Sequence, residues 1–182
     1  MVGDVAVVGD RIAAIADGES WRGRDEVDAR GLAVAPGFIN MLSWATESLL
    51  VDGRAQSDVR QGVTLEVMGE GFSMGPLTAP MKEELAAASH FGVEVEWTTL
   101  AEYLELLEQR GVSPNVASFV GSATVREHEL GADDRPPTAD ELERMQGLVR
   151  EAMREGALGL AGRSSGTLRA PRRRRRPRCA GA

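Results

Sequence analysis

Three short stretches directly follow apolar runs of this chain, and their side chains are the first candidates for chemistry. They cover residues 40–44, 69–76 and 121–126. In the second stretch Glu70 stands between two glycines, which let neighbouring backbone approach closely while the carboxylate points outward. A carboxylate oxygen is an acceptable zinc ligand, so Glu70 is a candidate metal ligand. The alternative is an ordinary loop carboxylate in water.

Two further side chains in these stretches are candidates for contacts with a substrate. Trp44 is expected to wall a substrate pocket, with simple packing as the alternative, and Ser73 is expected to contact the substrate. Ser73 has no histidine near it in the sequence, which argues against a nucleophilic triad. His90 is expected at a helix end, on the surface or as a C-terminal cap. His128 is expected at a solvated helix position, with an approach to the candidate site as the alternative, and Glu66 is expected to pair with an arginine.

The first part of the chain has the pattern of short strands. Two β-branched runs on either side of Gly9 predict a hairpin over residues 4–16, because glycine readily takes the positive φ that a tight turn needs. A further strand is predicted over residues 32–35. Together these strands predict part of a small β-sandwich domain over residues 1–35.

From residue 36 onward strand and helix patterns alternate, and these elements must position the candidate residues. The predicted strands are 36–40, 64–68, 116–120 and 157–160. The predicted helices are 45–51, 56–61, 80–89, 98–110 and 138–156. Alternation of this kind favours parallel βαβ units. Four strands are half of a closed eight-stranded barrel, so the sequence predicts an α/β fold with the first half of a (β/α)8 TIM barrel over residues 36–162.

Composition bounds the class of protein. The chain of 182 residues carries 21 basic and 28 acidic residues and a single cysteine, Cys179. One cysteine excludes an intrachain disulfide and a Cys-x-x-Cys zinc site, and it fits a reducing cytoplasm. No apolar run reaches 18 residues, so neither a membrane span nor a membrane partner is expected. Cytoplasmic localisation is therefore predicted.

Residues 163–182 differ from the rest of the chain. They hold eight arginines and no acidic residue, which leaves 13 basic against 28 acidic residues in 1–162. Like charges repel and little apolar surface offsets the chain entropy, so this tail is expected to be disordered. Either the tail is a frameshift or truncation artefact of a GC-rich gene, which the excess of arginine over lysine indicates, or it is a genuine arginine arm. Only the genuine arm would give nucleic acid as a partner.

Several separate blocks resemble known enzymes. An apolar strand ending in Pro36-Gly37-Phe38-Ile39 resembles the start of the catalytic barrel in the amidohydrolase superfamily. Further blocks resemble the N-acyl-D-amino-acid deacylases (D-aminoacylases) within that superfamily. These blocks are residues 61–76, 97–104, 115–121, 125–126, 134–138 and 154–159. The resemblance covers roughly residues 4–161.

The resemblance implies a metal-dependent hydrolase. In that family a divalent metal, expected to be zinc, activates water for attack on the amide carbonyl of an N-acyl amino acid. The His-x-His pair of metal ligands maps to Leu42 and Trp44, neither of which can bind metal, and a cysteine ligand maps to Glu70. The remaining ligands and the catalytic aspartate are expected beyond residue 162.

Three hypotheses about function follow. The first is that the chain is a fragment of a metal-dependent amidohydrolase that cleaves a non-peptide C–N bond in a small N-acyl amino acid or related amide. The second is a truncated homologue or scaffold without catalysis, because both histidines of the pair are replaced. The third is nucleic-acid binding through the arginine-rich tail, which requires the tail to be genuine.

Overall fold

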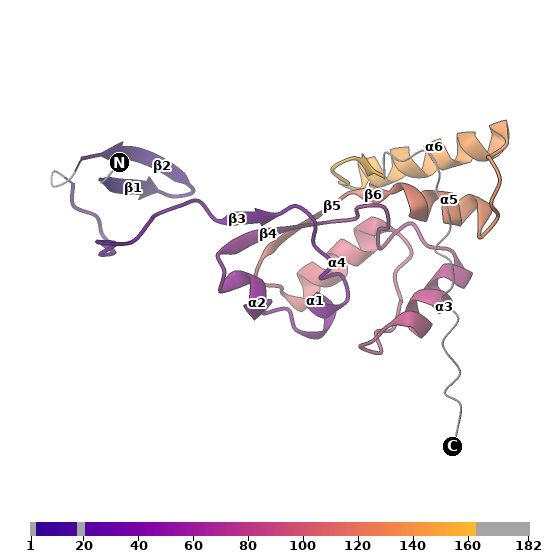
Figure 1. The fold of residues 1–182 in the computed structure, drawn as a ribbon, viewed down its shortest axis with the longest axis horizontal. Coiled ribbons are helices and arrows are strands. Elements are labelled where there is room, and N and C mark those ends of the chain that lie inside the picture. Colours follow the sequence, from indigo (N-terminus) through magenta and orange to yellow (C-terminus); the bar gives the residue numbers. More distant parts are fainter. Residues whose placement is uncertain (1–2, 18–20, 163–182) are drawn as a thin grey trace, which may run out of the picture. The chain divides into compact units, whose positions relative to one another are not determined.

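The computed structural model describes residues 3–17 and 21–162, and Figure 1 shows the course of the chain. The predicted disorder of residues 163–182 lies outside the described residues. The chain divides into two compact units, Met1–Pro36 and Gly37–Ala182. Within the described ranges no helix is both long and apolar enough to cross a membrane.

The first unit contains one antiparallel hairpin, as predicted. Strand β1 (Asp4–Val8) pairs with strand β2 (Arg11–Ala16), and Gly9 takes a φ of 62° in the turn between them. The predicted strand over residues 32–35 is wrong, because these residues pair with no described strand. An extended segment becomes a strand only when a neighbour satisfies its backbone hydrogen bonds.

The second unit is a mixed α/β fold built on parallel strands. Strand β3 (Phe38–Asn40) pairs with β4 (Val63–Met68), and β4 pairs with β5 (Asn115–Ser118), in parallel in both cases. Strand β6 (Val120–Gly121) pairs in parallel with β7 (Leu160–Ala161). These strands confirm the predicted parallel βαβ pattern, although β7 begins at Leu160, three residues later than the predicted strand 157–160.

The two sheets are joined through one stretch of chain, residues 115–121. The Phe119 amide donates to the Met68 carbonyl at 2.9 Å, which extends the pairing with β4. The Leu158 and Val120 amides donate to the Ser118 and Gly159 carbonyls at 2.8 and 2.9 Å, which extends the pairing with β7. The backbone order is therefore β3, β4, β5–β6, β7, with neighbours in sequence also neighbours in space.

Six helices lie in the described part of this unit. Their bounds are α1 Ser48–Val51, α2 Gln56–Val59, α3 Ala79–Ala88, α4 Leu100–Arg110, α5 Ser122–Leu130 and α6 Ala139–Arg154. Five correspond to predicted helices, although α1 is three residues shorter at its start than predicted. Helix α5 has no predicted range, since its apolar residues follow no strong helical stripe, although a helical position was expected for His128.

Capping residues fix the two longest helices. Thr99 begins α4 and Thr138 begins α6, each in a capping box with the glutamate three residues later. Helix α4 presents Leu100, Tyr103 and Leu107 to the core, all at most 1% exposed. The Tyr103 hydroxyl donates to the Thr46 carbonyl at 2.9 Å. Burial raises the pKa of this phenol well above its ordinary value.

Candidate functional site

The carboxyl ends of the parallel strands bring the three candidate stretches, residues 40–44, 69–76 and 121–126, to one edge of the sheet. Because β3, β4 and β5–β6 run in the same direction, the residues that follow each strand emerge on the same side. The Ser43 amide donates to the Val67 carbonyl at 2.9 Å, and the Ala123 amide donates to the Gly71 carbonyl at 2.8 Å. The first stretch is therefore tied to β4 itself, and the third stretch to the loop that follows β4.

The loop after β4 is clamped to the start of α5 by two side chains. The Ser73 hydroxyl donates to the Gly75 carbonyl at 2.5 Å and accepts from the Gly121 amide at 3.0 Å. The Thr124 hydroxyl accepts from the Ser73 amide at 2.8 Å. Both side chains are buried. These hydrogen bonds give Ser73 a structural role, and its predicted contact with a substrate stays a prediction.

Two glycines allow this close packing. A Cβ added at Gly69 would overlap the Phe119 carbonyl oxygen, and one added at Gly121 would overlap the Gly71 carbonyl oxygen. Gly69 also has a φ of 89°, in the region that favours glycine. The glycine-rich sequence around Glu70 therefore serves backbone approach between neighbouring strands.

The side chains at the exposed edge are mainly apolar. Leu42 and Trp44, at the positions that map to the His-x-His pair, are exposed, and Trp44 is 71% exposed. Phe72 in the next loop is exposed as well. Glu70 is exposed in the same loop. Trp44 thus lies at the edge where a pocket wall was predicted, and its role there stays a prediction.

The described residues do not assemble a metal site. Within them, no three histidine, cysteine, aspartate or glutamate side chains come together closely enough to hold an ion. Glu70 could supply one carboxylate ligand, but Leu42 and Trp44 offer no donor atom. His90 is exposed, and half-buried His128 lies on α5 with Nδ1 at 3.3 Å from Glu129 Oε1. His128 was expected to be solvated, but α5 leaves its side chain only 24% exposed.

Asn40 and Glu66 form a buried polar pair that the sequence pattern did not predict. Glu66 is 1% exposed and accepts from Asn40 Nδ2 at 2.9 Å through Oε2, while Oε1 has no hydrogen-bond partner. The predicted pairing of Glu66 with an arginine is wrong. Strand register explains the difference, because Asn40 is the residue directly opposite Glu66 on β3. The amide of Asn40 also holds the strand end, since Oδ1 accepts from the Leu42 amide at 3.3 Å.

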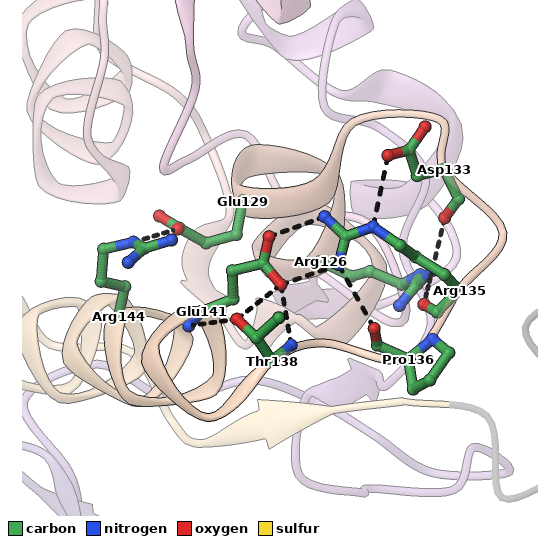
Figure 2. Close-up of polar contacts among 8 residues, drawn as sticks. All are labelled: Arg126, Glu129, Asp133, Arg135, Pro136, Thr138, Glu141 and Arg144. Carbon is green, nitrogen blue, oxygen red and sulfur yellow. Dashed lines mark hydrogen bonds and ion pairs between the residues drawn. The ribbon is translucent and has the colours of Figure 1, made fainter.

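A polar cluster ties α5 to α6, as Figure 2 shows. Arg126 on α5 donates through Nη2 to the Asp133 and Arg135 carbonyls at 2.6 and 2.8 Å. Arg135 forms a bidentate pair with Glu141 at 2.8 and 2.6 Å. This guanidinium, together with the Thr138 amide, lowers the pKa of Glu141 far below its usual value. The cluster therefore holds the connection between the two helices.

Comparisons with known proteins point to one group of enzymes. D-aminoacylase from Alcaligenes xylosoxydans xylosoxydans is 34% identical over 159 residues, which are 87% of this chain and 33% of the relative. N-acyl-D-aspartate deacylase from the same organism is 34% identical over 173 residues, 93% of this chain and 34% of the relative. The chain thus spans about one third of the length of these relatives. No protein-family profile matches it.

Solved structures agree with the sequence comparison. A crystal structure of D-aminoacylase, described as defining a novel subset of amidohydrolases, matches with a TM-score of 0.73 at 34% identity. The match covers 88% of this chain and 34% of that one. N-acyl-D-glutamate deacylase from Bordetella bronchiseptica, complexed with zinc and a phosphonate mimic of the tetrahedral intermediate, matches with a TM-score of 0.66 at 29% identity, over 82% of this chain and 32% of that one. The predicted resemblance to the D-aminoacylases is confirmed.

Proposed function

From its homology to the D-aminoacylases and N-acyl-D-amino-acid deacylases, we propose that this chain is the opening part of a metal-dependent amidohydrolase. The complete protein would hydrolyse the amide bond of a small N-acyl amino acid. The observation that carries this proposal is the agreement of sequence and fold with D-aminoacylase over 88% of the chain. That this chain is a fragment is part of the proposal, since the relatives are about three times as long.

The proposed architecture is the first half of a (β/α)8 barrel. The parallel order β3, β4, β5–β6, β7 supports it, because sequential neighbours around a sheet are typical of a barrel. A doubly wound sheet would instead reverse its strand order at a switch point. In a barrel the chemistry belongs at the carboxyl ends of the strands, which is where Trp44 and Glu70 lie.

A divalent metal, with zinc as the expected ion, is part of the proposal for the complete protein only. The D-aminoacylase relative has a binuclear metal centre, and the N-acyl-D-glutamate deacylase relative was solved with zinc. The described residues offer Glu70 as a single carboxylate, so they do not fit such a centre on their own. Further ligands and the catalytic aspartate are proposed to follow residue 162.

An inert homologue is the second candidate function, and one observation favours it. Leu42 and Trp44 place apolar side chains at the positions of the His-x-His pair, and both are exposed just after the carboxyl end of β3. Without that pair the protein would keep the scaffold and lose the metal chemistry. The single cysteine of the chain supports a cytoplasmic location in either case.

Reading the genomic DNA beyond the Gly162 codon in all three frames tests the fragment proposal. The expected result is an open frame that continues with further strand–helix units and histidines resembling the relatives. Purified protein from that longer frame should hydrolyse N-acetyl-D-amino acids and contain zinc by mass spectrometry. An absence of any such continuation in every frame would contradict the proposal and favour the inert scaffold.

A matched pair of variants in the longer protein tests the role of Glu70. Glu70→Gln removes the carboxylate charge and should lower zinc content, because an amide oxygen is a weaker zinc ligand. Glu83→Gln, an exposed carboxylate on α3, is the control and should leave zinc content unchanged. Equal zinc in both variants would remove Glu70 from the metal site without touching the wider proposal.

A further inference from the structure

The parallel sheet of the second unit has two edges without a described partner strand. Strand β3 pairs only with β4, and β7 pairs only with β6, within the residues that the structure describes. Open strand edges expose unpaired backbone donors and acceptors and tend to recruit another strand. The two edges carry the same strand direction, so each can continue the sheet in parallel.

Both edges are apolar as well as open. Ile39 on β3 and Leu160 on β7 are each 54% exposed, and Phe38 and Leu158 beside them are also exposed. Leu160 further lines an apolar groove of about 380 Å³ between α5, α6 and β7. Apolar surface of this kind at a strand edge marks an interaction site.

Residues 163–182 do not have the composition to cover these edges. They contain eight arginines, a single leucine and a single β-branched residue, Thr167, so they lack the run of apolar β-branched and aromatic side chains of a strand that packs on isoleucine and leucine. A covering element with an apolar face must therefore come from elsewhere. The second unit itself offers suitable strands, since β3 and β7 are complementary in direction and apolar character.

We propose that two copies of this 182-residue chain pair through these edges, β7 of each copy lying beside β3 of the other. Each copy supplies four strand positions, so two copies reach the eight strands of a closed barrel. A twofold axis makes both junctions identical, which closes the assembly at two copies. This inference rests on the barrel architecture of the proposed function and adds the partner that completes it in the isolated chain.

The pairing changes the surroundings of the candidate site. In a single copy, the carboxyl ends of the strands, where Trp44, Phe72 and Glu70 lie, are bounded by strands on one side only. In the pair, the partner copy contributes its own four strand ends, so the exposed aromatic side chains face a ring instead of open water. The site of the isolated chain is thus incomplete without the second copy.

Sedimentation equilibrium of the purified chain, over a wide concentration range, tests the pairing. The expected mass is twice the chain mass of 19.5 kDa, with no growth beyond two copies. Ile39→Lys or Leu160→Glu should each raise the dissociation constant at least about tenfold, because each places a charge in both apolar junctions. Phe91→Glu, at 55% exposure in the connection after α3, is the matched control and should remain paired.

Mixing the two charged variants gives the sharper test. In a mixed pair one junction is unchanged, because it joins β7 of the I39K copy to β3 of the L160E copy. The other junction brings together the two substituted side chains, which carry opposite charges and attract each other. The mixture should therefore recover the double mass that each variant lost alone. Circular dichroism checks that each variant keeps its helices.

A single-copy mass for the unchanged chain at every concentration would overturn the proposal. So would a mass that keeps growing with concentration, which indicates open chains, or a pair that neither edge variant weakens. A failed mixing test with folded variants would equally overturn it. These outcomes concern only the pairing of the 182-residue chain. The genomic sequence, the zinc content and the hydrolysis by the longer protein test the proposed function independently.

Discussion

At the scale of single residues, the Asn40–Glu66 pair is the most informative feature. A carboxylate that is 1% exposed keeps one oxygen without any partner, and the other accepts only from a neutral amide. Burying such a group is costly unless it is hydrogen-bonded. Asn40 is therefore needed for Glu66 to be tolerated at this buried position.

Asn40→Ala is expected to destabilise the fold by about 2 kcal/mol, since it removes the one hydrogen bond to a buried carboxylate. In a Glu66→Gln background the same substitution should cost only about 1 kcal/mol, because the bond is then between neutral groups. Urea unfolding of the four proteins of this cycle gives both values. Equal costs in the two backgrounds would show that the two side chains are not coupled.

The Arg135–Glu141 pair predicts a stability that depends on pH. Arg135 holds the pKa of Glu141 below its ordinary value, so the pair stabilises the fold above the unfolded-state pKa of about 4.3. That contribution is lost as the pH falls toward the folded-state pKa. The difference in unfolding free energy between the unchanged protein and Arg135→Gln should therefore be present at neutral pH and vanish in acid. A difference that stays constant down to acid pH would argue against the pair.

At the scale of elements, the glycines after β4 decide how closely neighbouring strands approach. Gly71→Ala, at a φ of 79° with open space around it, should cost about 1 kcal/mol. Gly69→Ala has a similar φ of 89° and also meets the Phe119 carbonyl, so it should cost about 3 kcal/mol. Thermal and urea unfolding measure both. Equal costs would mean that the backbone shifts freely to admit a methyl group.

The sequence predicted elements with strong local signals and missed those that depend on distant partners. The caps Thr99 and Thr138 and the apolar stripes of α4 and α6 act within one helix, so their patterns sufficed. The predicted strand at 32–35 failed because strand formation needs a neighbour that the local sequence does not encode. The bounds of helix α5 were not predicted, because tertiary hydrogen bonds such as Ser73 to Thr124 hold this helix, rather than a strong apolar stripe.

The features of the candidate site also divide into those that local sequence patterns predicted and those that depend on distant partners. Parallel strand ends could be predicted to meet, because that follows from the alternation of elements, and Trp44 and Glu70 lie at that edge. The burial of Ser73 could not be predicted, since its two backbone partners come from its own loop and from residue 121. The Asn40–Glu66 pair depends on the register between two strands, which no local pattern specifies.

At the scale of the whole molecule, the two units should differ in local stability. The side chains of β1 and β2 are exposed or half-buried, whereas β4 carries Glu66, Val67 and Met68 fully buried in the sheet centre. A two-stranded hairpin is marginal on its own, and amides exchange with solvent by local opening. Amide hydrogen exchange should therefore be fastest over residues 4–16 and slowest over 63–68. Comparable protection in both segments would contradict this difference.

The stretch 115–121, which pairs with both β4 and β7, limits where the gene can gain or lose codons. Its seven residues pair with one neighbour through their first part and with another through their last part. Inserting or deleting a single codon here would turn every side chain on one flank to the opposite face, and no loop lies within the stretch to absorb the change. Natural length variation should consequently concentrate in connections such as residues 89–97 and 131–137, and spare this stretch.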